Sequence, residues 1–149
     1  SILADPRPVK MKEEVNAKVK FREEFRPFAP SVLEERAQDL FVMEHPSPFM
    51  TITYPVRPEW QERLGAITHV DGTARVQTVS ADTNPRFHSL ISAFAEETGV
   101  PAVLNTSLNA RGEPIVEAPI DALRTFNGTG LDAIFLGDCI LEKPASPRP

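Results

Sequence analysis

The sequence has 149 residues, of which 41% are hydrophobic and 25% are charged. This length suits one domain, because a single hydrophobic core usually serves about 100–200 residues, and the composition predicts a packed core. The net charge of −5 argues against a nucleic-acid-binding protein, which needs a basic surface, but not against a small anionic ligand. We expect no signal peptide, because the first residues lack its basic and apolar blocks, and no apolar run approaches the roughly 20 residues that cross a bilayer. We expect a cytoplasmic protein without membrane or nucleic-acid partners.

The predicted elements are a mixture of helices and strands, punctuated by 15 prolines. In chain order we expect a helix over 11–18, an extended or edge strand over 25–33, a short helix over 33–42, a strand over 49–56, a hairpin over 66–79, a helix over 84–98, a short strand over 102–104, a helix over 119–126, and strands near 132–136 and 138–141. The mixture predicts an α/β (α+β) domain over 1–143 with a twisted mixed sheet flanked by helices. We expect a disordered tail over 144–149.

The expected hairpin turns at Asp71-Gly72, a pair favoured where two central turn residues need positive φ. Pairing across this turn would place Thr68 opposite Arg75. One face of the hairpin would then carry polar side chains: Thr68, Thr73, Arg75 and Gln77. His69 would fall on the apolar face, where a hydrogen-bonded core histidine is slightly favoured over a catalytic base. The polar face is the natural wall of a binding site.

Two cations lie close together in the segment 18–26. On an extended chain Lys20 and Arg22 would point to the same face, because side chains alternate with a period of two. Lysine as a mobile point charge and arginine as a planar fork suit a phosphate ligand. From this segment alone, a solvated basic strand paired with Glu23 and Glu24 is favoured over a binding site.

A polar segment, 105–114, follows the short apolar strand over 102–104. Asn105, Ser107 and Asn109 recur at a spacing of two, which places amide and hydroxyl groups on one side. Such groups hydrogen-bond phosphate oxygens or a nucleobase without adding charge, and ligands often bind beyond strand carboxyl ends. A loop whose side chains satisfy its own backbone explains the pattern equally well.

Other reactive side chains give no recognisable site. The three histidines lack metal-ligand spacing, and the sequence contains neither a Gly-Lys-Ser/Thr phosphate loop nor a Gly-x-Ser-x-Gly elbow. The single cysteine, Cys139, lies in an apolar run and is expected in the core rather than as a nucleophile. One thiol forms no intrachain disulfide, which agrees with a reducing compartment.

Four segments together resemble the C-terminal domain of the nodulation and antibiotic O-carbamoyltransferases: 1–7, 19–33, 68–79 and 105–115. The resemblance covers residues 1–142, with the segments in the same order. That domain is in turn similar to threonylcarbamoyladenylate synthase, in which a Lys-x-Arg pair and a Ser-x-Asn segment bind a nucleotide on a twisted α/β sheet. The corresponding segments are Lys20-Phe21-Arg22 and Ser107-Leu108-Asn109.

The resemblance implies that the chain converts carbamoyl phosphate and ATP to carbamoyl adenylate, with Mg²⁺ expected alongside ATP. Cations and neutral donors would then stabilise the phosphates, with no covalent nucleophile. The expected site consists of Lys20 and Arg22 on phosphate oxygens, Arg75 on the carbamoyl or phosphoryl anion, Ser107 and Asn109 on phosphates, Asn105 and Thr73 orienting the carbamoyl group or adenylate, and His69 as a further binding residue.

The resemblance also implies a partner. An N-terminal transferase domain of the full-length protein would move the carbamoyl group to a substrate hydroxyl, and iron is expected only in that domain. An arginine- and glycine-rich stretch normally precedes residue 1 in the family and contributes to the site, so the isolated domain can be inactive. A non-catalytic nucleotide-binding or partner-stabilising module is the main alternative, and an RNA-binding domain is the weakest one.

Overall fold

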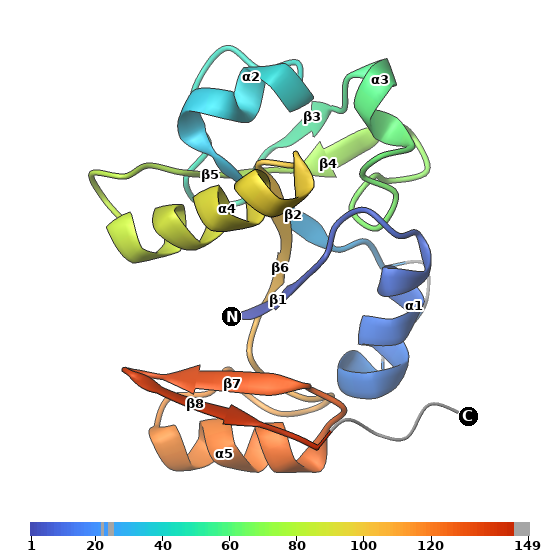
Figure 1. The fold of residues 1–149 in the computed structure, drawn as a ribbon. Coiled ribbons are helices and arrows are strands. Elements are labelled where there is room, and N and C mark those ends of the chain that lie inside the picture. Colours follow the sequence, from blue (N-terminus) through green and yellow to red (C-terminus); the bar gives the residue numbers. More distant parts are fainter. Residues whose placement is uncertain (22, 24–25, 145–149) are drawn as a thin grey trace.

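The computed structural model describes residues 1–21, 23 and 26–144 of the chain (Figure 1). Arg22 therefore lies outside the described residues, as does the expected tail beyond Pro144. The elements in chain order are β1 (Ile2–Ala4), α1 (Lys10–Val15), the π-helical η1 (Asn16–Lys20), β2 (Ala29–Leu33), the 3-10 helix η2 (Glu34–Arg36), α2 (Ala37–Leu40), β3 (Thr53–Pro55), α3 (Pro58–Gln61), β4 (Thr73–Arg75), β5 (Gln77–Val79), α4 (Pro85–Thr98), β6 (Ala102–Thr106), α5 (Pro119–Gly128), β7 (Ala133–Leu136) and β8 (Cys139–Glu142).

The central element is a four-stranded sheet with the order β1-β6-β2-β5. Strand β6 is antiparallel to both β1 and β2, whereas β2 and β5 are parallel, so the sheet is mixed. Two small antiparallel pairs, β3–β4 and β7–β8, complete the strands of the described residues. In Figure 1 the β7–β8 pair lies with α5 in a layer of its own, at the opposite end from α2 and α3. The predicted α+β class with a mixed sheet is confirmed.

The two faces of the sheet bury different sets of side chains, as the alternation along each strand requires. The main core includes Val32, Val76 and Leu104, together with Phe28 and Phe41 from the neighbouring segments. The opposite face buries a second cluster beneath helix α4: Leu33, Val79, Ile91 and Val103. Helix α4 therefore covers only the part of this face that is apolar.

Helix α4 confirms the prediction made from its flanking residues. The side chain of Asn84 accepts a hydrogen bond from the backbone N–H of Phe87 at 3.4 Å, and Pro85 occupies the first turn. Gly99 ends the helix in the left-handed conformation, with φ of +72°. No helix of the described residues is long and apolar enough to cross a membrane.

Strand β2 lies in the interior of the sheet, so the expectation of an edge strand over 25–33 is wrong. Proline is rare in central strands because it donates no hydrogen bond to the ladder. Here Pro30 pairs with Leu104 of β6, while pairing with β5 starts only at Ser31. The proline thus lies on the part of β2 that β5 does not reach.

The predicted hairpin over 66–79 is also wrong. The chain does reverse there, but Asp71 lacks the positive φ expected at the first of the two central turn residues. Gly72 has the expected positive φ, +76°, and the backbone N–H of His69 donates to the carbonyl of Thr73 at 2.7 Å. Residues 66–70, however, form no strand, because the chain coils after α3 and the Thr68 hydroxyl donates to the carbonyl of Leu64 at 2.9 Å. Strand β4 pairs instead with β3, and Arg75 lies opposite Thr53 rather than Thr68.

Most other predicted elements occur with changed boundaries. The helix over 11–18 appears as α1 and η1, the helix over 33–42 as η2 and α2, and the strand over 49–56 only as the three residues of β3. The last helix and the two final strands are confirmed as α5, β7 and β8. Cys139 is exposed, so its assignment to the core is wrong. Cys139 lies in β8, which among the described strands pairs only with β7. Helix α5 packs against Ile134 of β7, and the residues of β8 remain exposed to solvent.

Candidate functional site

The ammonium group of Lys20 joins two segments that are 87 residues apart in the sequence. Its Nζ donates to the carbonyl oxygen and hydroxyl of Ser107, at 2.6 and 3.1 Å. It also donates to the side-chain Oδ1 and carbonyl oxygen of Asn109, at 2.8 and 3.2 Å. Lys20 is only 6% exposed, so these contacts lie in a largely desolvated position. We call Lys20, Ser107 and Asn109 the lysine cluster.

The end of η1 fixes the position of Lys20. Phe21 turns the chain into the left-handed conformation, with φ of +47°. Gly130 packs against the same helix: its N–H donates to the carbonyl of Lys18 at 2.8 Å, and a Cβ at Gly130 would lie 2.7 Å from that of Lys18. Lys20 thus projects from a helix end and not from an extended chain, and it is buried, so the expectation of a solvated basic strand is wrong for this residue.

The segment around Ser107 forms a closed loop. The Ser107 hydroxyl donates to Oδ1 of Asn109 at 2.6 Å, and the Asn109 amide donates to the carbonyl of Glu113 at 2.9 Å. The backbone N–H of Val116 also donates to the carbonyl of Leu108 at 3.0 Å. The polar side chains therefore satisfy their own loop, and the same loop holds Lys20. The interpretation of a self-satisfied loop is confirmed for Ser107 and Asn109, whereas phosphate binding by this segment stays a prediction.

Arg111 is a second cation beside the lysine cluster, and the sequence interpretation missed it. Its guanidinium donates to the carbonyl of Phe21 at 3.0 Å, one residue beyond Lys20. The amino group of Ser1 lies near as well: burial, and secondarily the charge of Lys20, lower its pKa. The location of Arg111 inside the polar segment 105–114 was the only available signal.

Three side chains from adjacent strands form a hydrogen-bonded row beside the lysine cluster, on the face that α4 leaves open. The Asn105 amide donates to the Ser31 hydroxyl at 2.9 Å and to Oε1 of Gln77 at 3.1 Å, and Ser31 donates to the same Oε1 at 2.6 Å. The amide of Gln77 donates in turn to the carbonyl of Pro48 at 3.2 Å, which fixes the orientation of both amides. We call Ser31, Gln77 and Asn105 the polar row. The sequence interpretation did not single out Ser31.

Arg75 lies two residues before Gln77, so the strand alternation that buries Ala74 and Val76 directs Arg75 toward the side of the polar row. The Arg75 side chain is exposed. Its guanidinium makes no hydrogen bond or ion pair to any residue in the described part of the chain. The structure thus brings Lys20, Ser107 and Asn109 into direct contact, and Asn105 beside them, but it does not join Arg75 to them. Arg22 lies outside the described residues.

His69, Thr73 and Asp71 form a separate chain of hydrogen bonds, which we call the Asp71 relay. The Thr73 hydroxyl donates to the Asp71 carboxylate at 2.7 Å, so its oxygen accepts a hydrogen bond from Nδ1 of His69 at 3.1 Å. Nε2 of His69 is buried without a hydrogen-bond partner among the described residues. Burial lowers the pKa of the imidazole; Arg75 and Lys12 lower it further, while Asp71 opposes them. His69 is therefore a neutral, partly buried ring.

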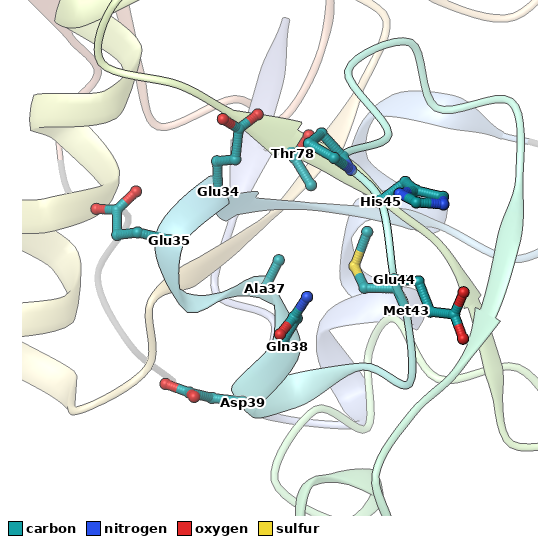
Figure 2. A pocket seen from close by; sticks show the side chains of 10 residues that line it. Glu34, Glu35, Ala37, Gln38, Asp39, Met43, Glu44, His45 and Thr78 are labelled. Atoms are coloured by element: carbon teal, nitrogen blue, oxygen red, sulfur yellow. The ribbon is translucent and has the colours of Figure 1, made fainter.

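A cavity of about 330 Å³ lies elsewhere, between η2–α2 and the segment 43–46 (Figure 2). Its lining includes four carboxylates: Glu34, Glu35, Asp39 and Glu44. This concentration of negative charge disfavours a phosphate ligand. In the described residues no three histidine, cysteine or acidic side chains are grouped as metal ligands. The lysine cluster and the polar row are therefore the better candidate site for an anion.

The chain is similar to known proteins over nearly all of its length. The family model described as "Carbamoyltransferase C-terminus" matches residues 1–143. The chain is 51% identical over 152 residues to nodulation protein NolNO of Sinorhizobium fredii, covering 99% of this chain and 22% of the relative. It is 51% identical to nodulation protein NolO of Bradyrhizobium diazoefficiens, covering 98% and 27%, and 42% identical to nodulation protein U of Rhizobium tropici, covering 75% and 19%.

The chain thus spans about a quarter of the length of NolNO and NolO, and it aligns with them over nearly all of its own length. The match to the family model runs through both segments of the lysine cluster and all three strands of the polar row. The chain belongs to the family of carbamoyltransferase C-terminal domains.

Proposed function

We propose that this chain forms carbamoyl adenylate from carbamoyl phosphate and ATP. Water would cleave carbamoyl phosphate to carbamate and phosphate. A carbamate oxygen would then attack the α-phosphorus of ATP, forming the new P–O bond as the bond to pyrophosphate breaks. Negative charge gathers on phosphate oxygens throughout, so fixed cations and neutral donors are the main means of stabilising this transition state.

The lysine cluster is the observation that supports the proposal. Its two segments are the Lys-x-Arg and Ser-x-Asn positions of the resemblance, and they meet through a buried ammonium group. The Ser107 and Asn109 oxygens that accept from Lys20 are uncharged, whereas a phosphate oxygen carries negative charge and accepts a stronger hydrogen bond. A bound phosphate would take over N–H donors of Lys20 and release the Ser107 hydroxyl to donate to it as well. Arg111, at Phe21, adds positive charge to the same neighbourhood.

The remaining assignments follow from position. Arg75 is exposed on the side of the polar row, where it is available to a carbamoyl or phosphoryl anion. Asn105 would orient the carbamoyl group from within that row. Thr73 and His69 belong to the Asp71 relay, so we assign them to the wall of the site beside Arg75. We expect Mg²⁺ to enter with ATP, held mainly by phosphate oxygens and water.

The relatives are much longer than this chain. We propose that the rest of such a protein transfers the carbamoyl group to an acceptor hydroxyl, and that any iron belongs there. This division of labour implies that the adenylate leaves the lysine cluster before transfer.

A pyrophosphate-release assay tests the proposal and separates it from the alternative of a non-catalytic module. The chain, alone and joined to the preceding segment of a relative such as NolO, is given ATP with Mg²⁺, with and without carbamoyl phosphate. We expect pyrophosphate release that requires carbamoyl phosphate, in at least one of the two forms. Nucleotide binding without any carbamoyl-phosphate-dependent release, in both forms, would support the module instead.

Arg75→Ala sharpens this assay because the Arg75 guanidinium makes no hydrogen bond or ion pair within the described part of the chain. The substitution should leave the thermal unfolding midpoint unchanged and reduce carbamoyl-phosphate-dependent release by a few hundred-fold, equivalent to about 3–4 kcal/mol, by analogy with the loss of one oxyanion donor. Arg63→Ala, at a position where the guanidinium lies over the Trp60 ring, is a matched control with the same loss of charge. Activity of Arg75→Ala within about threefold of the unmodified chain would remove Arg75 from the site.

A further inference from the structure

The segment 47–50 is a rigid turn attached to strand β5. Ser47 is buried and makes three hydrogen bonds there: its N–H donates to the Thr78 hydroxyl at 3.0 Å, its hydroxyl donates to the carbonyl of Val76 at 3.1 Å, and its carbonyl accepts from the Thr78 N–H at 2.9 Å. These bonds fix the chain immediately before Pro48. The carbonyl of Pro48 is fixed as well, because it accepts a hydrogen bond from the Gln77 amide.

This turn holds an aromatic ring in solvent. Phe49 is 81% exposed, the highest exposure of any described phenylalanine, and the next residue, Met50, has φ of +55°. A left-handed conformation is uncommon outside glycine, and such strain is often found at functional sites. An exposed aromatic side chain on a fixed, strained turn is typical of a surface that receives a ligand.

Gln77 connects this turn to the candidate site. Its amide donates to the carbonyl of Pro48, and its Oε1 accepts from Ser31 and Asn105 of the polar row. From Asn105 to Pro48 the path crosses β6, β2, β5 and the attached turn, three steps of about 4.8 Å or roughly 14 Å in all. This separation is comparable to the span of an extended nucleoside triphosphate.

We propose that Phe49 provides the stacking surface for the nucleobase of the bound nucleotide, a role that rests on the proposed function. The phosphates would lie toward the lysine cluster, and the polar row would lie between them and the base. Arg75 is placed along the same path, because it pairs with Thr53, three residues after Met50. Base–aromatic stacking tolerates different bases, so Phe49 would set affinity for a nucleotide over bare phosphates rather than strict selectivity for adenine.

Calorimetric titration with two probes tests this inference. The probes are a non-hydrolysable ATP analogue and inorganic triphosphate, each with Mg²⁺, titrated into the chain and into Phe49→Ala. We expect Phe49→Ala to weaken binding of the analogue by about tenfold or more, the range of one lost stacking contact, and to leave triphosphate binding unchanged. Phe135→Ala is the matched control: Phe135 is 71% exposed, on β7, and its loss should change neither affinity.

Phe49→Trp gives a second readout that does not depend on affinity. The indole should preserve analogue binding, and its fluorescence should be quenched by the analogue but not by triphosphate. Equal affinity of the chain and Phe49→Ala for the analogue would overturn the inference and leave the proposed function standing, as would an equal loss for both probes. If neither probe binds to the chain, either alone or joined to the preceding segment of a relative such as NolO, the proposed function fails, and the role of Phe49 with it.

Discussion

Two neighbouring layers on one face of the sheet differ completely in chemistry, although they lie only two residues apart along each strand. The first layer is apolar and covered by α4, and the second is the hydrogen-bonded polar row. The corresponding residues are Leu33 and Ser31 in β2, Val79 and Gln77 in β5, and Val103 and Asn105 in β6. Helix α4 packs on the apolar layer and leaves the polar row uncovered.

The comparison separates what stabilises the domain from what is available for binding. Each fully buried aliphatic side chain of the apolar layer contributes roughly 1.5–3 kcal/mol to folding. The polar row contributes much less net, because its hydrogen bonds replace bonds to water. A protein selected only for stability has no need of the second layer. Substitutions in the apolar layer should therefore act mainly on stability, whereas substitutions on the polar side should act mainly on activity and have a smaller effect on stability.

Lys20→Ala should have the largest effect on the polar side of this comparison. It removes the buried ammonium that binds Ser107 and Asn109, and we expect the rate of carbamoyl-phosphate-dependent pyrophosphate release to fall by several hundred-fold, about 3–4 kcal/mol. Steady-state kinetics measure this loss. Lys18→Ala, exposed on the same helix, is the control and should stay near the unmodified rate. A rate for Lys20→Ala within threefold would contradict the assigned role.

Ile91→Ala tests the apolar side. Ile91 is fully buried on α4, and its truncation leaves a cavity over the sheet. We expect a loss of about 2–3 kcal/mol in the free energy of unfolding, in the lower part of the usual range because the half-buried Phe87 and Phe94 can shift into the space. Urea unfolding measures the loss, and Leu90→Ala on the exposed side of the helix is the control. A change in nucleotide affinity at low temperature would show that the two layers are not independent.

Sequence-based prediction succeeded where an element is determined by nearby residues and failed where it depends on residues far away in the chain. Helix α4 was found because its determinants are local: Asn84 caps it, Pro85 begins it and Gly99 ends it. The hairpin failed because the turn at Gly72 specifies a reversal but not the partner strand. The partner of β4 is β3, about 20 residues earlier, and turn chemistry contains no information about that pairing.

The same distinction holds for the candidate site. Ser107 and Asn109 stood out because their polar groups directly follow a buried strand. Lys20 was chosen on the assumption of an extended chain, whereas it is the last residue of a helix. The prediction therefore rested on the residue type and not on the predicted geometry. Ser31 and Arg111 were missed because their importance comes from partners 74 and 90 residues away. Such contacts become visible only in the folded chain.

Substitutions of Asn105 should produce a smaller effect that tests the orientation of the polar row. The Gln77 amide nitrogen donates to the carbonyl of Pro48, so Oε1 of Gln77 faces Asn105. Asn105 can therefore bind this oxygen only through its N–H groups. Asn105→Ala should cost about 1–2 kcal/mol of unfolding free energy, the value of a lost buried hydrogen-bonding group. Asn105→Asp should cost more, because it places a carboxylate against an oxygen. Thermal unfolding at neutral pH compares the two; equal stability of both variants would mean that the row can reverse its hydrogen bonds.

The pH dependence of stability at His69 should be the smallest of these effects. Burial, chiefly, lowers the pKa of His69 below its ordinary value of 6.5; Arg75 and Lys12 add to this, and Asp71 opposes it. The unfolded chain therefore takes up this proton at a higher pH than the folded chain does. Stability from this group is complete above about pH 6.5 and is lost as the pH falls toward the lowered pKa of the folded state.

His69→Gln removes the titrating ring and so isolates its contribution. Urea unfolding at pH 7.5 and 5.5 should show a smaller loss of stability on acidification for His69→Gln than for the unmodified chain. The carboxylates whose pKa is lowered, Asp5, Glu35 and Asp71, titrate below this window and are common to both proteins. Identical losses would mean that the imidazolium is accommodated in the folded state. The protonated Nε2 would then need a hydrogen-bond acceptor, which Thr73 and Asp71 do not provide because they lie on the Nδ1 side of the ring. The backbone around His69 and Arg75 would therefore have to be more flexible than the neighbouring sheet.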